Sequence, residues 1–258
     1  MDFSIFVPYD LLPWHWAAWI CMGLCIGLNK AGFSGITAII IPVVALIFGA
    51  KESTGINLPL LWFADILVVL YYRRHTEWKY IFRLLPWTVA GFFVAILVDR
   101  LVPVQLFKYL MGGSILAGLI VMVWNDRRGK EVPPPSSWWF SALFGIAGGF
   151  ATMIGNVSGG IMAVFLLSMR LPKKSFVGTA AWYFLIVNSL KIPIQAVLWK
   201  NISAQTLLFD LTNIPFVIAG ILLGIFLVKI ISEKVFRRAI MILTLVSTML
   251  LFIDFSKF

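Results

Sequence analysis

The chain has 258 residues, of which 61% are hydrophobic and 12% charged, and its mean hydropathy is +0.97. Soluble domains are about half apolar and about one quarter charged, so this composition excludes an ordinary soluble domain and predicts an integral membrane protein. The net charge of +10 resides in short basic segments between apolar runs. Membrane topology explains such a pattern, whereas a nucleic-acid partner does not.

Apolar runs separated by polar or helix-breaking residues predict ten helical segments. In the first half they cover residues 14–28, 36–48, 53–72, 84–98 and 105–124, and in the second half residues 138–154, 160–169, 175–199, 212–230 and 234–253. A polar, proline-rich linker at residues 125–137 divides them. We therefore expect an all-α membrane protein built from two units, residues 1–130 and 131–258.

The two halves resemble each other in three places, which indicates duplication of a five-segment unit. The matches are PWTVAG at residues 86–91 with PFVIAG at 215–220, LFK at 106–108 with VFR at 235–237, and GITA at 35–38 with GIMA at 160–163. The first two matches also share their spacing within each half. Three matches in the same order are unlike chance similarity.

Charge decides whether the two copies are parallel or inverted. A bilayer core of about 30 Å requires roughly 20 helical residues, and the segments at 36–48 and 160–169 are shorter. Each short segment can fold back as part of a re-entrant hairpin or can barely span the bilayer. In both cases the basic segments lie on one side of the membrane, and the nearly neutral loops at 51–52 and 200–210 lie on the other side. The basic segments are residues 73–83, 127–130, 170–174 and 229–238.

The positive-inside rule prefers this arrangement. We therefore predict two inverted repeats, each a short broken-helix hairpin followed by three transmembrane helices, with the hairpins at residues 14–48 and 138–169. Both termini are then expected outside. The tryptophans near segment ends are expected in interfacial belts, namely Trp14, Trp16, Trp19, Trp138, Trp139 and Trp199.

Glycine-rich runs interrupt the first apolar stretch of each half, GLNKAGFSG at residues 27–35 and GNVSGG at 155–160. Broken segments at matching positions of two halves point to the binding site of a transporter. Backbone that turns within lipid must line a polar chamber, and helices starting at about Phe33 and Val157 would direct their positive ends into it, which favours an anion. The expected substrate-binding residues are Asn29, Lys30, Gly32, Ser34, Gly35, Asn156, Ser158, Gly159, Gly160 and Lys191.

Several of these residues also have a purely structural interpretation. An internal salt bridge with Asp65 would explain Lys30, and extension to the outer interface would explain Lys191. Glycines in membrane helices often serve close packing, which we expect of Gly145, Gly149, Gly220 and Gly224. For the glycines of the two interruptions, packing is the alternative to a role in binding.

A carboxylate in the first half corresponds to an amide in the second. Asp65 follows Gly55 at the spacing at which Asn188 follows Gly178. We hypothesise that Asp65 and Asn188 serve ion coupling, with Asp65 carrying a proton or helping to hold a cation such as sodium. The alternative is that Asp65 only neutralises Lys30.

The paired Gly-rich motifs, the short helices after them and the repeated Pro-x-x-x-Ala-Gly run resemble the sulfite exporter TauE/SafE family of bacterial membrane permeases. The resemblance covers nearly the entire chain. It implies transport of a sulfur-containing anion, such as sulfite, thiosulfate or an organosulfonate, across the inner (cytoplasmic) membrane of a bacterium. The richer glycine strings of that family are reduced here to residues 30–35.

The sequence therefore predicts a secondary transporter that works by alternating access, and the alternative is an anion-selective channel with a Gly/Lys constriction. The chain contains no nucleophile elbow, HExxH or P-loop motif, so we expect neither an enzyme nor a cofactor. The two cysteines and two histidines suggest no metal site. A homodimer is compatible with the residues, which fix neither the oligomeric state nor the coupling ion.

Overall fold

The computed structural model describes residue 9, residues 11–98 and residues 137–251 of the chain. All regular elements in these ranges are helices: α1 (Pro13–Lys30), α2 (Thr37–Phe48), α3 (Ala50–Tyr72), η2 (Arg73–His75), α4 (Trp78–Val98), α6 (Trp138–Gly155), α7 (Gly159–Ser168), α8 (Lys173–Pro193), η3 (Ile194–Trp199), α9 (Ala204–Leu211), α10 (Ile214–Ile230) and α11 (Glu233–Leu251). The predicted segment at 105–124, with its LFK match, and the linker residues 125–136, with their basic group, lie outside the described residues.

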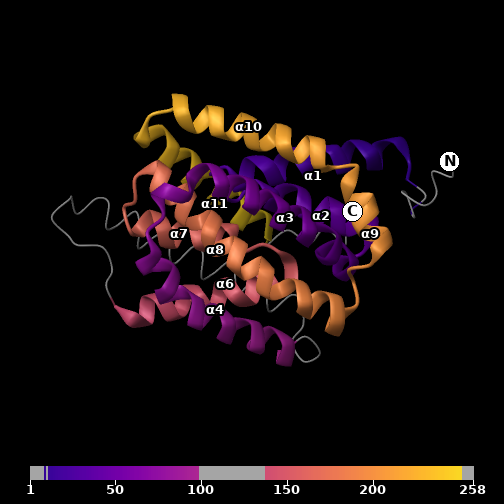
Figure 1. Ribbon diagram of the computed structural model, residues 1–258, viewed down its shortest axis with the longest axis horizontal. Coiled ribbons are helices and arrows are strands. Elements are labelled where there is room, and N and C mark those ends of the chain that lie inside the picture. The colour runs from indigo at the N-terminus through magenta and orange to yellow at the C-terminus, as the bar shows by residue number, and fades with distance from the viewer. Residues whose placement is uncertain (1–8, 10, 99–136, 252–258) are drawn as a thin grey trace.

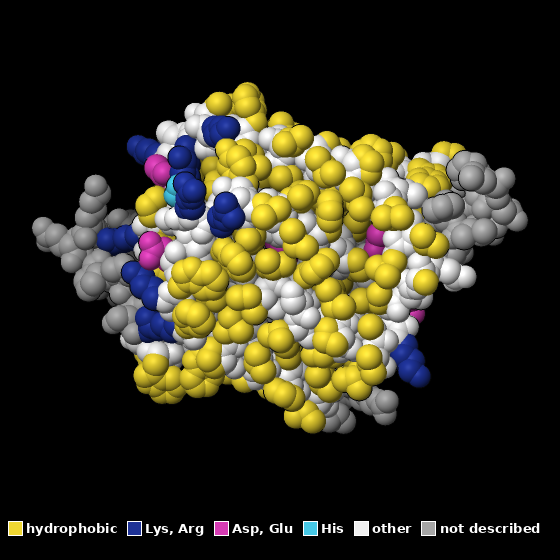
Figure 2. Space-filling view, viewed as in Figure 1, with side chains coloured by type: hydrophobic (Ala, Val, Ile, Leu, Met, Phe, Trp, Pro, Cys, Tyr) yellow, Lys and Arg dark blue, Asp and Glu magenta, His cyan; other side chains and the backbone are white. Residues whose placement is uncertain are grey.

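Four helical stretches within the described ranges are long and apolar enough to cross a membrane: Glu52–His75, Trp78–Leu97, Trp138–Gly155 and Lys173–Trp199. Helices α9 and α10 reach that length only together and are bent by 53° at their junction, so as one broken span they would make a fifth. Hydrophobic side chains cover the middle of the face seen in Figure 2. The expectation of an all-helical, multi-pass membrane protein is confirmed.

Two helix pairs flank a central pair. In Figure 1, α10 lies along α1 at one edge, α4 lies along α6 at the opposite edge, and α3 and α8 run between them. Both flanking pairs approach through glycines, because a Cβ added at Gly220 would lie 3.1 Å from Cα of Gly27, and one added at Gly91 would lie 3.1 Å from Cα of Gly149.

The packing role predicted for four glycines is confirmed, since a side chain at any of them would collide with the neighbouring helix. They are Gly145 and Gly149 against α4, and Gly220 and Gly224 against α1.

The two short helices fold back along the helices that precede them. The ring of Trp19, in the first half of α1, lies 5.6 Å from Phe48 at the end of α2, and the ring of Phe140, at the start of α6, lies 5.8 Å from Phe165 near the end of α7. Each pair α1–α2 and α6–α7 is therefore a helical hairpin whose two outer ends lie together.

Helices α2 and α7 begin at Thr37 and Gly159, within one residue of the predicted segments 36–48 and 160–169, whereas the helix start expected at about Phe33 lies four residues too early. In the first interruption, Gly32 and Gly35 have φ angles of +129° and +100°. A helix cannot pass through residues in this left-handed region, so α2 starts only after the second of them.

Three of the predicted basic segments meet at one end of the molecule. The backbone N–H of Glu77 donates to Oγ1 of Thr179 at 3.0 Å, the N–H of Lys173 donates to the carboxylate of Glu233 at 2.9 Å, and Arg237 donates to the carbonyl of Leu167 at 3.2 Å. These contacts join the end of α3, the start of α8 and the start of α11. Figure 2 shows most Lys and Arg side chains of that face gathered at this end.

The stretch at 200–210, predicted as a loop, contains the short helix α9, which begins with Ser203 as its N-cap, accepting from the N–H of Thr206 at 3.2 Å. This helix places Phe209 on the ring of Trp19 with a centroid distance of 4.4 Å. The interfacial position predicted for Trp19 is therefore wrong: its side chain is 1% exposed, and its indole N–H donates to Thr212.

Helix α4 also starts earlier than predicted, at Trp78 instead of at residue 84.

Candidate functional site

One face of α8 carries the residues around which the site is built. Phe184, Asn188 and Lys191 follow one another at helical spacing, so their side chains lie on the same side of the helix. Asn188 and Lys191 are almost completely buried. The face meets α1, α3 and α6, whose polar side chains complete the site.

The first group of the site is the buried ion pair between Lys30 and Asp65. Nζ of Lys30 lies 2.8 Å from Oδ1 and 2.9 Å from Oδ2 of Asp65, and Asn188 donates to the same Oδ2 at 2.7 Å. The ammonium also lies 4.4 Å from the ring centroid of Phe184. The predicted salt bridge is therefore confirmed, and the positive charge of Lys30 is already balanced.

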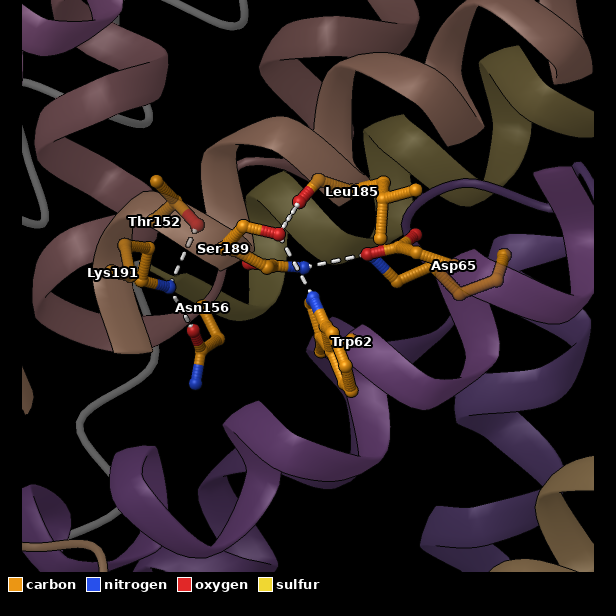
Figure 3. Close-up of polar contacts among 9 residues, drawn as sticks. Trp62, Asp65, Thr152, Asn156, Leu185, Ser189 and Lys191 are labelled. Carbon is orange, nitrogen blue, oxygen red and sulfur yellow. Dashed lines mark hydrogen bonds and ion pairs between the residues drawn. The ribbon is translucent and has the colours of Figure 1, made fainter. Parts of the chain in front are cut away.

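The second group is centred on Lys191, which is 0% exposed and does not extend to the outer interface, so that alternative is wrong. Its ammonium donates to Oγ1 of Thr152 at 3.1 Å and to Oδ1 of Asn156 (Figure 3). Both partners are neutral, and no carboxylate of the described residues lies within ion-pair distance of this ammonium. Lys191 is thus a buried lysine without a carboxylate partner in the part of the chain that the structure describes.

The two groups are close neighbours. In Figure 3, Ser189 and Trp62 lie between them, and the indole N–H of Trp62 donates to the hydroxyl of Ser189 at 2.9 Å. Ser189 lies between Asn188 and Lys191 in the chain, and the charge of Lys191 is near enough to interact with those of Lys30 and Asp65. An anion at Lys191 would therefore sense the ion pair.

The interruptions of the two hairpins touch each other. Oδ1 of Asn29 accepts from the N–H of Gly35 at 2.9 Å, which closes the first turn. A Cβ added at Gly159 would lie 3.5 Å from the N atom of Gly35 and 3.6 Å from that same Oδ1. Residues that lie in different halves of the chain are thus in contact at their glycine turns.

For the other predicted residues, the described part of the structure shows no hydrogen bond or ion pair to these two groups. Gly32 faces Val177 of α8 and Phe236 of α11, and Ser34 and Gly160 are buried. Ser158, also buried, lines a hollow described next.

Two narrow hollows lie beside the hairpins. One is lined by Met22, Ile26, Thr37, Ile41, Asn57, Leu61 and Asn156, and it has room for about one water molecule. The other is narrower and is lined by Leu84, Phe144, Gly148, Ser158, Ile161, Met162, Phe165 and Tyr183. Neither admits an anion without movement of the surrounding helices.

Sequence reasoning missed three polar residues of this region, Thr37, Asn57 and Thr152. Asn57 had a signal, because it is an amide inside a long apolar segment, and its buried Oδ1 has no hydrogen-bond partner in the described structure. Nowhere in the described ranges do three His, Cys, Asp or Glu side chains come together as metal ligands would.

A comparison with protein families matches residues 19–251 to the model described as Sulfite exporter TauE/SafE. The matched range includes both glycine interruptions and every residue of the two polar groups. No match was found among curated proteins or among solved structures.

Proposed function

Because the chain belongs to the sulfite exporter TauE/SafE family, we propose that it is a secondary transporter that moves sulfite, thiosulfate or an organosulfonate across the bacterial inner membrane. The observation that carries this proposal is the buried Lys191, whose hydrogen-bond partners among the described residues are both neutral. A charged side chain at the centre of a bilayer costs about 2.5–3.5 kcal/mol even on insertion scales. A small anion in contact with the ammonium supplies the missing counter-charge.

The substrate contacts follow from the position of Lys191. Thr152 and Asn156 hold the ammonium in place, and the two glycine interruptions, with Asn29, Ser34 and Ser158, supply backbone N–H groups, amides and hydroxyls as further donors for the anion. Lys30 contributes its charge when the substrate competes with Asp65 for its ammonium. Substrate binding is then coupled to the opening of the Lys30–Asp65 ion pair.

We propose that residues 1–130 and 131–258 are inverted repeats, and three sets of contacts support this. Gly55 packs on the backbone of Asn201 beyond η3, while its counterpart Gly178 packs on the backbone of His75 beyond α3. The corresponding residues Asp65 and Asn188 contact each other, as two positions beside a two-fold axis would. Finally, the pair α1–α10 corresponds to the pair α6–α4.

Alternating access suits this architecture better than an open channel does. The two hollows are lined by corresponding parts of the two halves, since Thr37 in one matches Met162 in the other. Both hollows are too narrow for an anion, so the substrate must wait for one bundle to move relative to the other.

The basic end should face the cytoplasm by the positive-inside rule, which leaves both termini outside. With an inside-negative potential, an uncoupled anion moves outward at about 2.3 kcal/mol per charge per 100 mV, so export needs no coupling ion. Import needs a coupling ion, and we propose that Asp65 carries it as a proton or that Asp65 and Asn188 together hold it as a sodium ion.

Counterflow in proteoliposomes tests the proposal. A carrier exchanges radiolabelled sulfite for unlabelled sulfite inside the vesicle, whereas a channel gives only dissipative flux. We expect wild-type exchange to be lost in Lys191→Met and kept in Lys200→Met, which removes an exposed lysine beyond the same helix. Full exchange by Lys191→Met, or no exchange of sulfite, thiosulfate or methanesulfonate by the wild type, would contradict the proposal.

A further inference from the structure

We infer that the site at Lys191 is matched to an anion that carries a single charge, such as a sulfonate or hydrogensulfite, and selects against dianions such as sulfate and thiosulfate. The inference rests on the proposed transport function and narrows its substrate class.

The charge count of the site comes first. Within the described ranges, the buried charged side chains are Lys30, Asp65, Lys191 and Asp210. Asp210 belongs to α9 and lies beside Tyr9, near the outer ends of the first hairpin, away from the site. Two lysines and one aspartate remain, so with both lysines protonated and Asp65 ionised the site carries a net charge of +1.

A bound monoanion brings the net charge of this site to zero, whereas a bound dianion makes the net charge negative. In a buried environment an unbalanced charge is strongly unfavourable, because water is not there to solvate it. A monoanion at Lys191 leaves a net charge of zero among buried groups. A dianion leaves one negative charge close to Asp65, which already carries one.

The hydrogen bonds of Lys191 point to the same stoichiometry. An ammonium group has three donors, of which Thr152 and Asn156 occupy two. One donor is left for one oxygen of the anion. The site therefore provides one direct charge-assisted hydrogen bond from an unbalanced cation, which suits one negative charge.

Two substitutions that hardly change side-chain size shift the charge count in opposite directions. Asn156→Asp places a carboxylate on the present partner of Lys191 and lowers the net charge to zero, so methanesulfonate binding should fall by about tenfold or more. Asp65→Asn raises the net charge to +2, so sulfate binding should improve by about tenfold or more.

The experiment titrates the purified full-length protein, by calorimetry at constant ionic strength, with methanesulfonate and with sulfate. We expect the wild type to bind methanesulfonate about tenfold or more tightly than sulfate. Asn201→Asp adds a carboxylate outside the site and should leave this ratio unchanged, while gel filtration checks that each variant is folded.

A wild type that binds sulfate as tightly as methanesulfonate would overturn the inference, as would a ratio that neither Asn156→Asp nor Asp65→Asn alters. If Asp65→Asn does not fold, the double variant Lys30→Met/Asp65→Asn takes its place, since it keeps the net charge at +1 and must keep the preference for methanesulfonate. Equal binding of monoanions and dianions would contradict this inference alone. Absence of binding and of counterflow for every sulfur anion would contradict the proposed function.

Discussion

At the scale of single residues, two buried lysines that look alike in the sequence differ in their partners. Lys30 forms an ion pair with Asp65, whereas the two oxygens to which Lys191 donates within the described ranges are neutral. A paired lysine serves the structure with no ligand present, and an unpaired one is stabilised when an anion arrives. For this reason the proposed substrate role is assigned first to Lys191.

The ion pair should reveal itself in stability. Lys30→Met leaves the carboxylate of Asp65 buried without its cation and should destabilise the protein by about 3–5 kcal/mol, because breaking one side of a buried pair strands the other charge. Adding Asp65→Asn should restore much of this loss. Thermal unfolding of both single variants and the double variant measures the coupling. Additive losses would show that the pair contributes no interaction energy.

Asp65 should also decide whether a proton gradient drives transport. An inward proton gradient should stimulate methanesulfonate uptake by wild-type proteoliposomes at clamped voltage, and Asp65→Asn should abolish the stimulation because an amide cannot carry the proton. Glu52→Gln, which changes an exposed carboxylate of the same helix, is the control. If Asp65→Asn keeps the full stimulation, Asp65 serves only to neutralise Lys30.

At the scale of elements, the hairpins and the flanking helix pairs depend on glycine for different reasons. Positive φ angles at Gly32 and Gly35 turn the chain between α1 and α2, whereas Gly91 and Gly149 let α4 and α6 approach closely. Only the second kind can be tested by adding one methyl group without straining the backbone.

Adjacent glycines of α6 offer a matched pair for that test. A methyl group at Gly149 would collide with the carbonyl of Thr88, whereas one at Gly148 would meet its nearest neighbours, Ile161 and Tyr183, at 3.7 Å. We expect Gly149→Ala to destabilise the protein by about 1–3 kcal/mol or more and Gly148→Ala to be neutral or slightly stabilising. Thermal unfolding in one detergent compares them. Equal melting temperatures would mean that α4 and α6 are not packed as described.

The elements were largely predictable, because apolar runs that end at Gly, Pro or charged residues mark helix ends in lipid. The bounds of α1, α2 and α6 agree with the predicted segments to within a few residues for that reason. Helix α9 was missed because it is short and amphipathic, and because the polar residues next to it are typical of a loop. The Lys30–Asp65 pair could be suggested because both residues lie deep within apolar segments, where a charged side chain needs a partner. The contact of Lys191 with Thr152 depends on how α6 packs against α8, which a single sequence does not show.

At the scale of the whole molecule, charge separates the two ends. Three basic segments lie together at one end, namely residues 73–83, 170–174 and 229–238. Lys200 lies at the other end, because the next residue, Asn201, donates to Thr54 in the first turns of α3. The start of α3 lies beside the end of α8 and the start of α8 beside the end of α3, so these two helices pack in opposite directions, as the proposed inverted repeats require. Parallel copies would instead bring the starts of these two corresponding helices to the same end of the molecule.

Cysteine labelling in intact cells tests the inverted arrangement directly. In a background with Cys21→Ala and Cys25→Ala, a membrane-impermeant maleimide should label Lys200→Cys from outside but reach Lys79→Cys and Lys174→Cys only after the membrane is opened, because all three lysines are exposed and the last two belong to the basic end. Lys79 comes just after the end of α3, and Lys174 lies at the start of α8, the counterpart of α3, so parallel copies would put the two lysines on opposite faces. Labelling of one but not the other in intact cells would therefore rule out inverted repeats, and with them a shared chamber entered by hairpins from both sides.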